Sequence, residues 1–195
     1  FYRTVYSSHL LWQEQNQIFL NTPQWLSTYF DSPAWLGCMA GDWLTQFYHN
    51  TVDGAIILSL AVGCCTACCA IILFRLLPRW AALAGTVVFA VLMAACSMSS
   101  TTTLAFFMCL AGGLATALPC LWIRCGKKLV LDFSPLLVVP AYWAFGFGAL
   151  ITAIAIPLLS IKKYRSRGHG GYAWLGAGVA VALALVIPAL LRGHY

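Results

Sequence analysis

The feature that most constrains the fold is a run of 21 residues, Gly54 to Phe74, that contains no charged side chain. A helix needs about 20 such residues, at about 1.5 Å of rise each, to cross the hydrocarbon core of a bilayer. The run ends at Arg75, and Pro78 and Arg79 follow, as expected where a membrane helix stops at the interface. We therefore predict a transmembrane helix over this run.

The composition of the whole chain is that of a membrane protein. Only 8% of the 195 residues are charged, 62% are hydrophobic, and the mean hydropathy is +0.84. A soluble domain of this length could not bury so much apolar surface in one core. The net charge of +6 does not indicate nucleic-acid binding, because the basic residues lie in short segments between apolar runs.

Further apolar runs predict a bundle of about six membrane spans. We expect one span from about Trp80 to Met98 and another from about Leu104 to Ile123, separated by the polar run 99–103. The 33 residues from Leu129 to Ile161 are too long for one span, so two short helices that turn near Pro140 fit them best. A re-entrant hairpin is the alternative for this stretch, and it would remove two full crossings.

A last span is expected from about Tyr172 to Leu191, where small residues every four positions permit close approach of another helix. The predicted fold class is therefore all-α. A polytopic transmembrane helical bundle occupies residues 53–195, and short amphipathic helices occupy residues 1–52 on the non-cytoplasmic side. The sequence begins at Phe1 without a signal peptide, so we also expect a preceding membrane helix.

Orientation follows from the basic residues, because Lys and Arg accumulate in cytoplasmic loops. Alternate connections between the predicted spans differ sharply in their number of basic residues. One set holds nine of the eleven Lys and Arg residues, and the other holds only Arg3 and Arg192. We therefore expect a multi-pass inner-membrane protein with both ends of this sequence on the periplasmic side. The basic set contains Arg75, Arg79, Arg124, Lys127, Lys128, Lys162, Lys163, Arg165 and Arg167.

The N-terminal segment predicts three short helices. The first covers residues 7–20, and the dipeptides Thr22-Pro23 and Ser32-Pro33 each place a capping hydroxyl before a proline at the start of the next helix. The third is expected to be interfacial, with one apolar and one polar side. The apolar side holds Trp35, Leu36, Met39, Trp43, Leu44, Phe47 and Tyr48. The polar side holds Cys38, Asp42, Thr45, Gln46 and His49.

Two acids of this segment are candidate catalytic residues. Glu14 lies among polar side chains with His9 a little over one turn away, and a positioned carboxylate could act there as a general base or bind a metal. A solvated helix carboxylate is the alternative. Asp42 is the second candidate, with His49 two turns along the same face. Cys38 with these two matches no strong zinc pattern, so no metal ligands are assigned.

For the other residues that could carry chemistry, a structural role is the preferred interpretation. Asp53 directly precedes the long apolar run, where a helix N-cap explains it. Asp132 can pair with Lys128 one turn away, with transport or proton handling as the alternative. The cysteines at 64, 65, 68 and 69 lie inside an apolar run, where cysteine is a small packing residue. We expect no disulfide framework.

Four short motifs carry a family resemblance: YSSHLLWQEQNQIFL at 6–20, TP at 22–23, WLTQFY at 43–48 and PAYW at 140–143. They resemble a family of large bacterial membrane proteins known only as a domain of unknown function. The resemblance covers nearly all of the chain. It implies that the chain is the N-terminal membrane portion of a longer protein in the bacterial inner membrane.

At the level of architecture, the chain is similar to GT-C type glycosyltransferases, which use polyprenyl-phosphate-linked sugars. In such enzymes an acid in the first outer loop activates the acceptor, and a divalent metal can assist. The resemblance therefore implies that Glu14 is this acid, with Asp42 as the second candidate. The chain lacks the paired acids usual after the first helix.

Three functions follow as hypotheses. The first is the membrane module of a lipid-linked-sugar glycosyltransferase, or a degenerate relative, with the bilayer and a polyprenyl-phosphate lipid as partners. The second is a non-catalytic anchor or scaffold subunit that binds other membrane subunits. The third is a transporter, which is weakest because few polar residues lie in the apolar runs.

Overall fold

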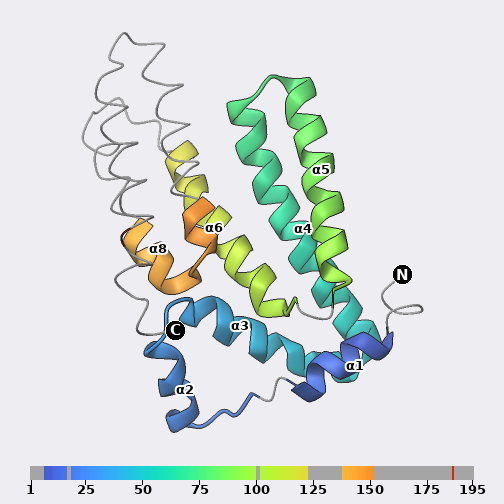
Figure 1. Ribbon diagram of the computed structural model, residues 1–195, viewed down its shortest axis with the longest axis vertical. Coiled ribbons are helices and arrows are strands. Elements are labelled where there is room, and N and C mark those ends of the chain that lie inside the picture. The colour runs from blue at the N-terminus through green and yellow to red at the C-terminus, as the bar shows by residue number, and fades with distance from the viewer. Residues whose placement is uncertain (1–6, 17–18, 100–101, 123–137, 152–185, 187–195) are drawn as a thin grey trace.

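Figure 1 shows the computed structural model, in which residues 7–16, 19–99, 102–122, 138–151 and 186 are described. All regular elements in this part of the chain are helices. Three longer helices, α4, α5 and α6, pack together, and a set of short helices from the N-terminus lies across one end of them (Figure 1). The all-α fold class is confirmed.

Helices α4 (Thr51–Leu76) and α5 (Arg79–Ser97) correspond to the first two predicted spans. Both are long and apolar enough to cross a membrane. They form an antiparallel pair joined at Leu77 and Pro78, where the proline fixes an extended backbone and the next helix starts at once (Figure 1). The other end of α4 is capped by Asn50, whose side chain accepts a hydrogen bond from the backbone N–H of Val52 at 3.2 Å.

The third predicted span forms helix α6 (Leu104–Trp122), which packs on α4. Its apolar part, Leu104–Pro119, is shorter than the two candidate spans. Two helices of the described residues therefore meet the length and composition of a membrane span, where the sequence predicted about six. The predicted span 172–191, apart from residue 186, and most of the stretch 129–161 lie outside the described residues.

Helix α8 (Val138–Phe145) corrects the turn predicted near Pro140. Pro140 lies within this helix, which continues through it to Phe145. The chain turns instead at Gly146, whose φ of +56° is accessible to glycine without a steric penalty. A helical segment resumes at residues 148–151.

The short helices at the N-terminus are α1 (Ser7–Asn16), α2 (Pro23–Phe30), α3 (Trp35–Thr45) and the 3-10 helix η1 (Gln46–His49). We call these four elements the N-terminal layer. The three predicted short helices are present, but residues 19–20, predicted to belong to the first, are not helical, and η1 extends the third. The start of α2 is as predicted, because the Thr22 hydroxyl accepts from the backbone N–H of Trp25 and a proline follows.

The predicted cap of the third helix is wrong. The Ser32 hydroxyl donates to the carbonyl of Tyr29 and so closes the end of α2 instead of opening α3. Helix α3 starts after Ala34, which has a left-handed φ of 69° and no side-chain cap. The backbone N–H of Ala34 donates to the carbonyl of Trp143 at 2.9 Å, which ties the start of α3 to α8.

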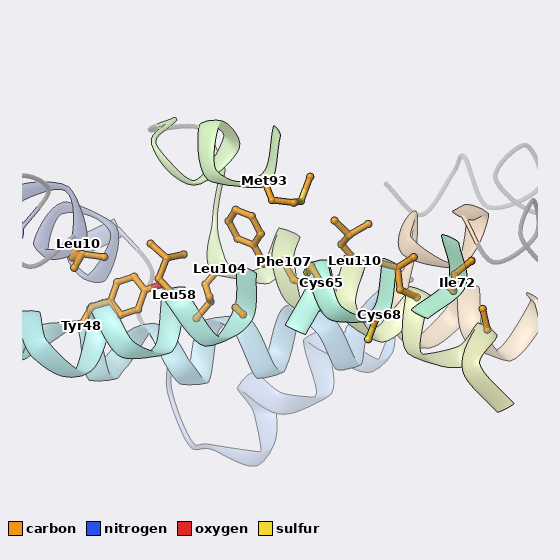
Figure 2. Close-up of a cluster of buried hydrophobic side chains, with 13 residues drawn as sticks. Leu10, Tyr48, Leu58, Cys65, Cys68, Ile72, Met93, Leu104, Phe107 and Leu110 are labelled. Atoms are coloured by element: carbon orange, nitrogen blue, oxygen red, sulfur yellow. Dashed lines mark hydrogen bonds between the residues drawn. The ribbon is translucent and has the colours of Figure 1, made fainter. Parts of the chain in front are cut away.

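The core lies where α4 and α6 meet and continues into the N-terminal layer. Figure 2 shows Leu58 and Cys65 of α4 beside Phe107 of α6, with Leu10 and Tyr48 of the layer at one end of the same cluster. Both layer residues are fully buried. Burying a side chain of this size stabilises the fold by about 1.5–3 kcal/mol. The layer is therefore part of one core with the longer helices.

Helix α3 packs on α6 through glycines, which the sequence prediction of its faces did not foresee. Gly37, Gly41 and Thr45 recur every four residues and are all buried. A Cβ atom placed on Gly41 would lie 2.7 Å from the Cβ of Ala105 and closer to its backbone. Such a contact is possible only for a residue without a side chain, so these positions bring the two backbones together.

The predicted apolar side of the third helix is split in the structure. Trp43 and Phe47 are exposed and pack edge to face with their ring centroids 5.4 Å apart, whereas Tyr48 is completely buried. The split begins within α3, because Leu44, one turn before Tyr48, packs against the same core whereas its neighbour Trp43 is exposed. Tyr48 therefore packs into the core instead of sharing the aromatic face.

Candidate functional site

Of the two predicted catalytic acids, Asp42 is the one whose side-chain contacts the structure describes. It lies on α3, beside the glycine face that packs on α6, and its side chain is half-buried. The hydroxyl of Tyr29, near the end of α2, donates to Asp42 Oδ2 at 2.7 Å. This hydrogen bond joins two separate helices of the layer, and it fixes one oxygen of the carboxylate.

Burial controls the electrostatics of this pair. Loss of water raises the pKa of Asp42 above its usual value, and the hydrogen bond from Tyr29 offsets part of that rise by favouring the charged form. Burial, the hydrogen bond and the negative charge of Asp42 together raise the pKa of Tyr29 to about 12. The phenol therefore remains a proton donor at neutral pH, while the carboxylate is more basic than an exposed one.

These properties suit proton transfer. A carboxylate with a raised pKa is a stronger base, and general-base catalysis improves as the pKa of the base approaches the working pH. Perturbed carboxyl groups occur often at functional sites, although structural hydrogen bonds also perturb them. The pair of Asp42 and Tyr29 is therefore the candidate site of the described residues.

Cys38 lies one helical turn before Asp42 on α3 and is also half-buried. Its thiol lies close to the thiol of Cys109 on α6, whose sulfur packs beside Gly37. Interaction with the Cys109 thiol lowers the pKa of Cys38, against the effects of burial and of the charge of Asp42. The contact exists because Gly37 lets α6 approach, since a Cβ placed there would meet Cys109.

Glu14, the other predicted acid, lies in α1. Its side chain, like that of His9, is outside the part of the chain that the structure describes, so its role stays a prediction. Helix α1 packs on η1 and α4, whereas Asp42 is paired with α2. Its neighbour Gln13 is buried and donates from Nε2 to the carbonyl of Thr102 at 2.8 Å.

Sequence reasoning missed both Gln13 and Tyr29 as partners. Gln13 stands in a run of polar residues, and the only available signal was the helical spacing that places it one turn from the buried Leu10. Tyr29 is separated from Asp42 by 13 residues and a break between helices, so no periodicity relates them. Only the packing of α2 on α3 brings the phenol to the carboxylate.

The donors around Asp42 do not fit a hard divalent cation. Mg²⁺ is held by several oxygen ligands, whereas one carboxylate, one protonated phenol and one thiol surround this position. Within the described ranges, no group of three or more His, Cys, Asp or Glu side chains comes together.

The remaining residues singled out in the sequence either have structural roles or lie outside the residues that the structure describes. Asp53 is not the N-cap of α4, because the helix starts at Thr51 and Asn50 caps it; Asp53 instead accepts from the Asn50 amide at 3.0 Å. Asp132 lies outside the described residues. Cys65 and Cys68 are buried in the core, as expected of packing residues.

Comparison with known proteins identifies a family whose function is unknown. No curated protein and no solved structure matches the chain. One family model does, and it spans residues 1–195, the whole length of the sequence. The chain therefore belongs to a family of unknown function (DUF6057).

Proposed function

We propose that this chain is the membrane-embedded module of a glycosyltransferase that uses a lipid-linked sugar, or of a degenerate relative of such an enzyme. The observation that carries the proposal is the Asp42–Tyr29 pair, a half-buried carboxylate with a raised pKa in a helical layer at one end of two very apolar helices. A substrate with a long apolar tail and a polar head would meet both parts of this arrangement.

The exposed apolar surface supports a bilayer location. In the isolated chain only 28% of the apolar window of α4 and 17% of that of α5 are buried, whereas the core helix of a soluble protein is mostly buried. Large side chains of the N-terminal layer are also exposed, including Trp25, Phe30 and Trp43. Aromatic rings of this kind are favoured at the boundary between headgroups and acyl chains.

In the proposed reaction Asp42 is the general base. It takes the proton from a hydroxyl group of the acceptor, whose oxygen attacks the anomeric carbon of the donor sugar. The bond between that carbon and the phosphate oxygen breaks, and the lipid phosphate leaves with the electron pair. Tyr29 holds Oδ2 of the carboxylate and so orients Oδ1 toward the acceptor. Glu14 remains the second proposed acid, on α1.

The experiment compares two acids of the same layer in membranes that contain the full-length protein. Radiolabelled polyprenyl-phosphate sugars are supplied as donors, and loss of label from the lipid fraction is measured. We expect Asp42→Asn to lower turnover by 10²–10⁴-fold, the usual contribution of a general base. Asp31→Asn is the control, because Asp31 is exposed at the end of α2.

Equal turnover in both variants would remove Asp42 from the mechanism. The same measurement on Glu14→Gln decides whether the second acid takes part. If the wild-type protein, correctly inserted, consumes none of the donors, the glycosyltransferase proposal fails. That result would favour the non-catalytic anchor described next.

The alternative is a non-catalytic anchor that binds other membrane subunits. It is favoured by one face of α5, where Leu83, Val87 and Val91 are each about half exposed or more and recur at helical spacing. Packing between membrane helices could cover this face. Purification in mild detergent tests the idea: a stable stoichiometric partner supports it, and a monomer without partners contradicts it.

A further inference from the structure

The described cysteines are all free, and one pair of them connects two separate parts of the fold. Cys38 belongs to the N-terminal layer and Cys109 to α6, 71 positions further along the chain. The Cys109 sulfur lies against Gly37, the residue next to Cys38, and this glycine contact holds the two backbones together. From this geometry we propose that Cys38 and Cys109 form a reversible disulfide that locks α3 onto α6.

The packing favours this bond over other pairings. A disulfide needs Cα atoms about 4.4–6.8 Å apart and sulfur atoms that can approach to about 2.05 Å. A Cβ atom on Gly37 would lie only 3.1 Å from the Cα of Cys109, so α3 and α6 already touch at the residue before Cys38. The other close cysteines, at 64, 65, 68 and 69, share the single helix α4, so a bond among them would join no separate elements.

The two thiols have different access, which sets the order of events. Cys38 is half-buried, whereas Cys109 is 2% exposed, so a reagent from solution reaches Cys38 first. Interaction with the Cys109 thiol also lowers the pKa of Cys38 and so favours its thiolate, the form that attacks disulfides. Asp42 is the charged group facing this thiol, and its negative charge works in the opposite direction.

The oxidant in the proposed step is a small disulfide such as oxidised glutathione. The Cys38 thiolate attacks one sulfur of that disulfide; a mixed disulfide forms, the original S–S bond breaks, and one glutathione thiolate leaves with the electron pair. The Cys109 thiolate then attacks the Cys38 sulfur and expels the second glutathione. Two protein thiols are oxidised by two electrons, and the reagent becomes two thiols that carry away the two protons.

The test uses the full-length protein in membrane vesicles held in glutathione buffers of increasing oxidised fraction. Free thiols are then blocked, the protein is denatured, and trypsin cuts after Arg75 and Arg79, which lie between the two cysteines. Without reductant, we expect the fragment with Cys38 to remain joined to the fragment with Cys109. Reductant should separate them.

Three variants decide between this pair and others. Cys38→Ser and Cys109→Ser should abolish the link, and Cys109→Ser should accumulate glutathione on Cys38, because the attacking thiol remains without its partner. Cys64→Ser is the control and should keep the link, since Cys64 is exposed on α4. Fragments that separate in the wild type, or a link that survives Cys38→Ser, would overturn the proposal. If a variant fails to fold, peptide mapping of the wild-type link decides alone.

Discussion

Substitution of Gly41 by alanine should destabilise the docking of the N-terminal layer. The added Cβ would lie 2.7 Å from the Cβ of Ala105 and nearer still to the Ala105 backbone. Carbon atoms pack at about 3.5–4.0 Å, so the helices must separate by on the order of 1 Å. Overpacking of this kind costs about 1–3 kcal/mol. Since α3 also carries Asp42, that separation would shift the candidate site.

The assay is thermal unfolding of the purified protein in mild detergent, followed by circular dichroism. In a soluble domain of this size, each kcal/mol corresponds to about 2–4 °C, so we expect the midpoint to fall by several degrees. Gly63→Ala is the control, because Gly63 is also helical but a Cβ there meets no atom within 4 Å. Ala105→Gly should rescue Gly41→Ala only in part, since the backbone contacts remain.

Equal midpoints for Gly41→Ala and Gly63→Ala would refute the reasoning. That result would mean that α3 does not depend on backbone contact with α6. Full rescue by Ala105→Gly would also contradict it, because the clash would then rest on one methyl group alone.

Three further predictions follow from hydrogen bonds and charge. Gln13→Leu removes the bond to the carbonyl of Thr102 and should cost about 1–3 kcal/mol, whereas Gln15→Leu, at an exposed position, should be nearly neutral; denaturant unfolding compares them. Tyr29→Phe should raise the pKa of Asp42 further, because the lost bond favoured the charged form, and NMR titration of the carboxyl would show no change if this is wrong. Stability should fall as pH rises from the ordinary carboxyl pKa of 3.8 through the higher pKa of folded Asp42, since the native state binds more protons there; Asp42→Asn should remove this component of the unfolding curve.

Much of the helical architecture could be predicted from the sequence. The long uncharged runs identified α4 and α5 because the composition of a helix that suits a bilayer is uniform along its whole length, so no partner is needed to recognise it. The start of α2 was also predictable, because Thr22 and Pro23 act within one helical turn. Such local signals do not depend on where the rest of the chain lies.

Predictions that needed neighbouring elements were less successful. Ser32 was expected to cap the third helix but bonds back to α2, and the turn expected near Pro140 occurs at Gly146. In each case the residue type was compatible with two local structures, and the packing of α3 against α8 selected one of them. The start of α3 is held by the carbonyl of Trp143, a group more than 100 residues away.

The candidate site shows the same division. The sequence by itself determined that Asp42 is one of few acids and lies on a helix beside aromatic residues, because composition and helical period are properties of the chain alone. Only the tertiary structure decided that Tyr29 holds this carboxylate, that Cys38 lies near Cys109, and that the glycine face of α3 packs on α6. The contacts between α3 and α6 depend on the close approach that Gly37 and Gly41 permit, and a glycine in a sequence does not indicate which helix will lie against it.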